Sequence, residues 1–156
     1  MGKFNNKIEA EFDPPRKWVL SRALTYTNPD IDGDALERVG VKVKEHKITV
    51  KKDFVTDLAS VPRQCWAFIA PWDVARAAII HDFLYKRIRQ YRAECSKALK
   101  STEDPQLISA AKKAADNVFH MAMKDAEPSV AGWKIAAAYY SVRMFGRWAI
   151  IPRVED

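Results

Sequence analysis

The hydrophobic pattern changes part-way along the chain, from a period of two residues to one of about 3.6 residues. In the segment Lys17–Tyr26, large hydrophobic side chains alternate with smaller or polar ones, as in a β-strand with one buried face. The alternation recurs at Val41–Lys44 and at Ile48–Lys51, with a turn at Glu45–His46 between them. We therefore predict a small antiparallel β-meander of three strands in the first third of the chain.

The helical period begins near Pro71, and proline and acidic residues mark the predicted helix starts. A first helix is predicted from about Trp72 to Arg89 or onward to Leu99. Asp104-Pro105 has the pattern of an N-cap followed by a proline at the first helical position. This pair predicts a second helix that ends near Lys124.

A third helix is predicted between Glu127-Pro128-Ser129 and Pro152. Helical spacing puts its bulky hydrophobic side chains on one face, which carries Trp133, Ala137, Tyr140, Met144 and Trp148. Aromatic residues permit an interface with a partner, but in a domain of this size they more often fill the core. We therefore expect the tryptophans and tyrosines of the chain to fill the core, with a partner interface as the alternative.

The length of 156 residues suits one domain. Strands followed by helices predict the α+β class, with residues 1–53 mainly β, 54–71 a junction loop and 72–149 helical. No apolar run reaches the roughly eighteen residues that a membrane span needs. The segment Asn28–Val39 is predicted to be a polar turn, because Val39 stands where a calcium-binding loop would need glutamate.

The net charge of +6 favours contact with phosphate groups, whether of nucleic acids or of lipids. However, no Lys/Arg run interleaves with aromatic residues, so the pattern favours a solvated basic surface over a nucleic-acid site. Cys65 and Cys95 are too few for a disulfide framework, and Met1–Lys7 lacks the apolar core of a secretory signal. We therefore expect synthesis in a reducing cytoplasm, which is compatible with later packaging into a particle.

Two titratable residues, His81 and Asp82, are adjacent in an apolar part of the first predicted helix. Burial there is costly unless both find polar partners. Tyr85 follows one turn later on the same sector of the helix, and Asp116 lies among alanines in the second helix. Antiparallel packing of the two helices would bring Asp116 beside His81 and Tyr85. The four residues therefore predict either a functional site or a structural polar cluster.

The segment Phe54–Arg63 joins the predicted sheet to the first helix and carries Thr56, Asp57, Ser60 and Arg63. Threonine, aspartate and serine side chains can bind the local backbone and hold a loop rigid. Arg63 can pair with Asp57 or with an anionic ligand. We expect this loop to border the polar cluster as supporting or binding residues. The alternative is a plain structural junction.

Four ordered runs resemble an uncharacterised family of small bacteriophage and prophage proteins: Phe54–Arg63, His81–Tyr85, Ala115–Phe119 and Val142–Gly146. That family shows a Thr-Asp-x-Ala-Ser-Val-Pro loop, a His-Asp-x-Leu-Tyr helix and an Ala-Asp-x-x-Phe helix, which match residues 56–62, 81–85 and 115–119. The resemblance covers residues 45–148. It implies a phage-encoded accessory or virion-associated protein, made in the host bacterial cytoplasm, with other phage proteins as partners.

The two helical motifs are also similar to the catalytic helices of secreted and viral phospholipases A2. That resemblance implies an antiparallel helix pair in which His81 is the general base, Asp116 orients it, and Tyr85 binds Asp116. Asp82 would be a calcium ligand, and a phospholipid ester would be the substrate. Two functions therefore stay open: an accessory protein whose cluster fixes structure or binds a partner, and a calcium-assisted hydrolase.

Overall fold

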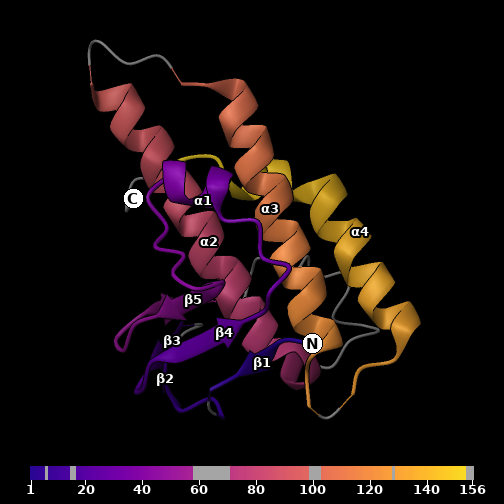
Figure 1. Cartoon of the computed structure of the whole chain (residues 1–156). Helices are drawn as coiled ribbons and strands as arrows, with labels where there is room; N and C mark the ends of the chain where they lie inside the picture. Colours follow the sequence, from indigo (N-terminus) through magenta and orange to yellow (C-terminus); the bar gives the residue numbers. More distant parts are fainter. Residues whose placement is uncertain (6, 15–16, 58–70, 99–102, 128, 154–156) are drawn as a thin grey trace.

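The computed structural model describes residues 1–5, 7–14, 17–57, 71–98, 103–127 and 129–153 (Figure 1). Short strands occupy the first part of the chain and long helices the rest, which confirms the α+β class. The elements are β1 (Lys3–Phe4), β2 (Ala10–Asp13), β3 (Lys17–Leu20), β4 (Leu24–Thr27), α1 (Asp34–Arg38), β5 (Lys47–Val50), β6 (Val55–Thr56), α2 (Pro71–Lys97), α3 (Pro105–Lys124) and α4 (Gly132–Ala149).

The strands of the described residues form two three-stranded antiparallel sheets, ordered β1-β4-β5 and β2-β3-β6. The predicted single meander is therefore wrong. The segment expected to be one strand divides, because β3 ends at Leu20 and β4 begins at Leu24 in the other sheet. The alternating pattern runs through this corner without glycine or proline, so the sequence shows no interruption.

Two further corrections concern the chain between β4 and β5. Val41–Val43 lies outside any strand, although the predicted turn at Glu45 and His46 is confirmed by their positive φ angles of 52° and 56°. Within the predicted polar turn, residues Asp34–Arg38 form the short helix α1. Leu36 on this helix is fully buried, and α1 packs against α3. Burial of one leucine against a neighbouring helix stabilises a helical turn that local sequence alone does not predict.

The three long helices confirm the helical predictions. α2 extends to Lys97, and α3 begins with Asp104 as N-cap, whose carboxylate accepts hydrogen bonds from Gln106 N (2.9 Å) and Leu107 N (3.2 Å). Figure 1 shows α3 between α2 and α4, with neighbouring helices antiparallel and the sheets beside α2. No helix of the described residues is both long and apolar enough to cross a membrane.

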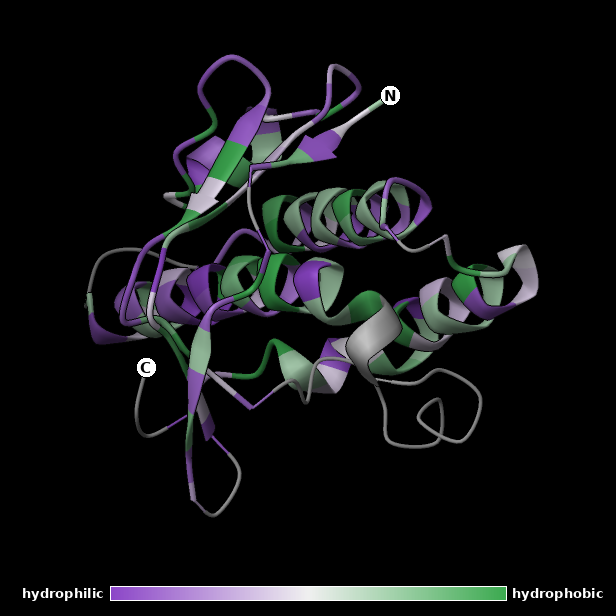
Figure 2. Cartoon of the chain, turned by 90° about the horizontal axis from the view of Figure 1, so that it is seen from below, coloured by the Kyte–Doolittle hydropathy of each residue, from purple (hydrophilic) through white to green (hydrophobic). Residues whose placement is uncertain are grey.

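The exposed face of α4 corrects another expectation. Trp133, Tyr140, Met144 and Trp148 are each between 54% and 64% exposed. The buried face instead carries small or medium residues, namely Ile135, Ala138, Val142 and Gly146. α4 lies at the right-hand edge of Figure 2. The bulky side chains stay outside because the space between α4 and α3 admits only short ones.

We expect Gly146→Ala to lower the melting temperature, because the position lies directly against Tyr85. A Cβ there would clash with the Tyr85 hydroxyl and would lie 3.2 Å from Lys112 Cε. Overpacking of this kind costs about 1–3 kcal/mol. Gly132→Ala in the same helix is the matched control, because nothing described lies within 4 Å of its Cβ position. Equal melting temperatures for the two variants would contradict this account of the packing.

Candidate functional site

A polar cluster centred on Asp116 lies between α2, α3 and α4. Asp116 and His81 are both fully buried. His81 Nε2 lies 2.9 Å from Asp116 Oδ1, and the Tyr85 hydroxyl donates to the same oxygen at 2.6 Å. One turn of α2 separates His81 from Tyr85, so both side chains reach α3 at one level. The predicted hydrogen-bond distance between His81 and Asp116 is thus confirmed.

The second carboxylate oxygen of Asp116, Oδ2, accepts hydrogen bonds from two cationic side chains. Lys112 Nζ donates to Oδ2 at 2.8 Å and Arg143 Nη1 at 3.0 Å. Lys112 also donates to the carbonyl of Val142 at 3.0 Å, which connects α3 to α4. Four donors from three helices therefore converge on one buried carboxylate.

These contacts set the protonation of the cluster. Burial by itself raises the pKa of Asp116, but hydrogen bonds and charge from His81, and hydrogen bonds from Lys112 and Tyr85, outweigh it and lower this pKa to about 2. Burial, and then the charge of Asp116, raise the pKa of the Tyr85 hydroxyl well above its usual range. Asp116 is therefore an ionised acceptor, and Tyr85 is a neutral donor.

The two ring nitrogens of His81 differ in their hydrogen bonding to the described residues. Its ring lies between those of Tyr85 and Phe119, with centroid distances of 4.0 Å and 4.8 Å. Nε2 binds Asp116, whereas Nδ1 is buried and has no hydrogen-bond partner among the residues that the structure describes. In the neutral ring, a proton on Nε2 leaves a lone pair on Nδ1. Buried polar atoms are usually partnered, so this nitrogen is a candidate base.

Asp82 belongs to an adjoining cavity on another side of α2. The Thr56 hydroxyl donates to Asp82 Oδ2 at 2.6 Å. The cavity has a volume of about 240 Å³, and its charged lining residues are Lys17, Asp57, Asp82, Lys86, Arg89 and Arg153. The first part of the predicted loop therefore borders the site through Thr56 and Asp57. Ser60 and Arg63 lie outside the described residues.

Comparison with known proteins places the chain in a family. The family model named Protein of unknown function (DUF1353) matches residues 36–142, more than half of the chain. The chain belongs to the DUF1353 family. His81, Asp82, Tyr85 and Asp116 all lie within the matched residues, so the expected membership of an uncharacterised family is confirmed. No curated protein and no solved structure matches this DUF1353 chain.

Two residues of the DUF1353 cluster, Lys112 and Arg143, were missing from the predicted site. Lys112 lies four residues before Asp116 on the same helix, and this ion-pair spacing is the signal that could have found it. Arg143 lies one residue beyond the family match, on α4. Only the packing of α4 brings it to Asp116, so the local sequence carries no comparable signal.

The carboxylates of the described residues do not by themselves make a complete calcium site. Calcium takes about six to eight oxygen ligands. Among the described ranges, no group of three or more His, Cys, Asp or Glu residues is placed to hold a metal ion. The carboxylates of Asp57 and Asp82 share their cavity with four basic side chains. Calcium binding at Asp82 therefore stays a prediction.

Proposed function

We propose that this DUF1353 protein is a hydrolase in which His81 is the general base. One observation carries the proposal: Nε2 is held by buried Asp116, while Nδ1 has no partner within the described residues. A histidine so oriented presents a lone pair in a fixed direction. Asp116 would stabilise the imidazolium that forms when Nδ1 takes a proton, and Tyr85 would keep the carboxylate in place.

The reaction class is hydrolysis of an ester. Nδ1 would take a proton from water while the water oxygen attacks the carbonyl carbon. The imidazolium would then return the proton to the leaving alkoxide, so the base is restored. His81 is fully buried, so the proposed reaction requires water and the ester carbonyl to reach Nδ1 inside the protein. The local resemblance to phospholipases A2 makes a phospholipid ester the first substrate to test.

A second candidate function is supported by the other contacts of Asp116. The carboxylate accepts donors from three helices, and Lys112 also binds the Val142 carbonyl. A cluster with these contacts fixes the packing of α2, α3 and α4. In that case the protein is a phage accessory or virion-associated protein that binds other phage proteins, and His81 has no chemical role.

An assay of ester hydrolysis tests the hydrolase proposal. We expect the wild-type protein to hydrolyse a short-chain phosphatidylcholine or a water-soluble nitrophenyl ester, measured with added calcium and with a chelator. If calcium assists, the chelator abolishes hydrolysis, and Asp82→Asn requires more calcium for the same rate because a charged ligand is lost. The control is Asp32→Asn, an exposed carboxylate outside the cavity lining. Failure to hydrolyse either ester in any condition would overturn the proposal.

A further inference from the structure

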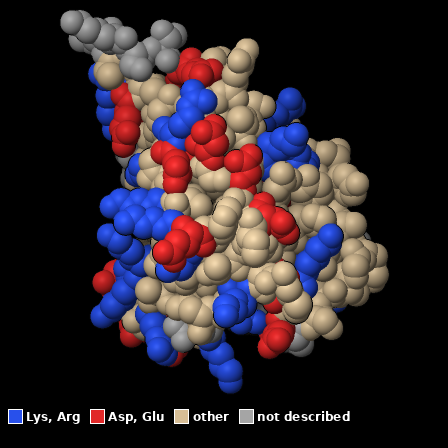
Figure 3. Space-filling model, viewed as in Figure 1, with Lys and Arg blue, Asp and Glu red and all other residues tan. Residues whose placement is uncertain are grey.

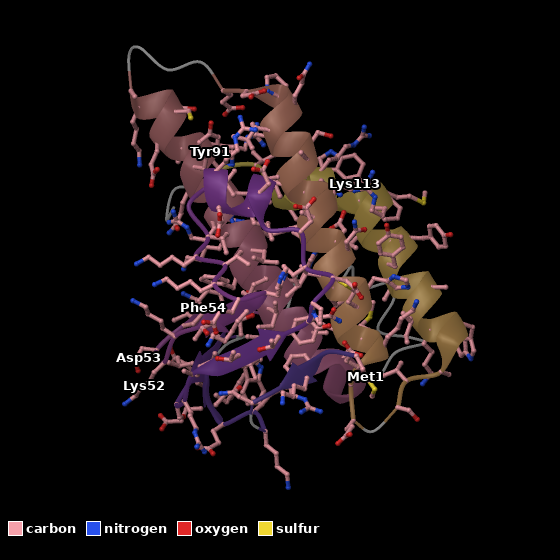
Figure 4. The ribbon with its side chains drawn as sticks, viewed as in Figure 1. Met1, Lys52, Asp53, Phe54, Tyr91 and Lys113 are labelled. Carbon is pink, nitrogen blue, oxygen red and sulfur yellow. The ribbon has the colours of Figure 1, made fainter. Side chains whose placement is uncertain are left out.

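A second cavity, of about 440 Å³, lies between α2 and the chain that connects β5 to β6. Its charged lining side chains come from three separate segments and are almost all basic: Lys42, Lys51, Lys52, Asp53, Lys86 and Arg87. Figure 3 shows basic side chains gathered over this side of the molecule, and Figure 4 places Lys52, Asp53 and Phe54 there.

The positive charge of this basic cavity is not neutralised within the described structure. Five cations face one carboxylate, Asp53. No ion pair within the described residues involves any of the four lysines. Like charges that share a small space repel one another, and a bound anion relieves that repulsion.

Arg87 is held in place at the wall of the basic cavity. Its Nη1 donates to Gln90 Oε1 at 2.6 Å, while Nε is buried with no hydrogen-bond partner in the described part of the chain. Gly40 has a φ of +90°, and a Cβ at this position would clash with Arg87 Nη2. The absence of a side chain at Gly40 therefore lets the guanidinium lie against the backbone. This arrangement presents a cation whose position is already ordered.

The basic cavity also has an apolar wall. The rings of Phe54 and Phe83, both of which line it, meet edge to face with centroids 5.7 Å apart. Lys86 Nζ lies 5.5 Å from the centroid of the Phe54 ring. A lysine ammonium within about 6 Å of a ring centroid is attracted to the face of the ring. The cavity thus combines ordered cations with a hydrophobic surface.

We propose that the basic cavity binds a small ligand with two or more phosphate charges. Lysine is a compact, strongly hydrated cation suited to phosphate oxygens, and arginine adds planar N–H donors. A single carboxylate would leave most of the cavity charge uncompensated, whereas a diphosphate group neutralises several cations together. The site is independent of the proposed hydrolase, although Lys86 lines both cavities.

Calorimetric titration with pyrophosphate and with inorganic phosphate tests this site. We expect pyrophosphate to bind more tightly than phosphate, and binding of both to weaken as salt is raised, because screening reduces attraction between exposed charges. Lys51→Gln and Lys52→Gln should each weaken pyrophosphate binding by about five- to tenfold, the effect of one lost charge near a ligand. The double variant should lose most of the binding, with the melting temperature unchanged.

The matched control is Lys113→Gln, because Lys113 is exposed and lies on the far side of the molecule beside α4 (Figure 4). This variant should bind pyrophosphate as the wild type does. Equal weakening in all variants would show attraction to net charge alone and would overturn the proposal. The proposal is also overturned if the wild type binds single-stranded DNA or vesicles of anionic lipid but does not bind pyrophosphate. His81→Gln should bind pyrophosphate normally, so a failure here is distinguishable from a failure of the hydrolase proposal.

Discussion

Replacement of Asp116 by alanine should lower the free energy of unfolding by about 3–5 kcal/mol, because it leaves the buried Lys112 ammonium without its counter-charge. Lys112 and Arg143 both end on Asp116 Oδ2, and the Lys112 side chain is only 10% exposed. Tyr85 would lose its acceptor as well. Denaturant unfolding followed by circular dichroism measures the change. Asp116→Asn keeps an acceptor oxygen and should cost less, about 1–3 kcal/mol.

The difference in free energy of unfolding between the wild type and Asp116→Asn should depend on pH. The reason is the pKa of Asp116, which is lowered from its usual 3.8 to about 2. A carboxyl with a lower pKa in the folded state stabilises the fold above its unfolded pKa, and loses this contribution as pH falls through the folded value. The stability gap between wild type and Asp116→Asn should therefore narrow between pH 4 and pH 2. Glu94→Ala is the exposed control, with an expected change within about 0.5 kcal/mol. An Asp116→Ala variant as stable as this control would refute the account of the cluster.

Replacement of His81 by glutamine should abolish hydrolysis while the protein stays folded. A general base contributes about 10²- to 10⁴-fold to rate, so kcat should fall by at least that range. Glutamine can still donate to Asp116. His81→Gln should therefore lower the free energy of unfolding by only about 1–3 kcal/mol, the cost of one lost buried hydrogen bond. Asp116→Asn should slow the reaction less than His81→Gln, since it misorients the base without removing it.

Parallel measurement of kcat and melting temperature separates catalysis from structure. His120→Gln is the matched histidine control, because the His120 ring packs against Tyr139, and none of the hydrogen bonds of Asp116 within the described residues comes from His120. It should leave kcat unchanged. A His81→Gln variant that melts earlier but hydrolyses ester at the wild-type rate would assign the cluster to structure alone, and the accessory-protein function would then be the better explanation.

The polar cluster could be predicted from sequence because buried charge is costly. His81 and Asp116 stand in apolar helical neighbourhoods, and helical spacing puts Tyr85 on the same sector as His81. Two such residues on neighbouring antiparallel helices have few partners other than each other. The Asp104-Pro105 pair likewise marks the start of α3 through a hydrogen bond to the local backbone, so local sequence is sufficient there.

The remaining features depend on contacts between distant segments. Arg143 reaches Asp116 only because Gly146 allows α4 to approach Tyr85, and no periodic pattern encodes that approach. The period of two residues predicts strands but not which strands pair, so two sheets replaced one meander. Hydrophobic spacing identified a stripe of bulky residues on one face of α4, but not whether that face is buried or exposed. Burial depends on which residues the neighbouring helix can accommodate. Local sequence determined the helices and the need for a polar partner, while long-range packing decided the partners, the sheet pairing and the exposed side of α4.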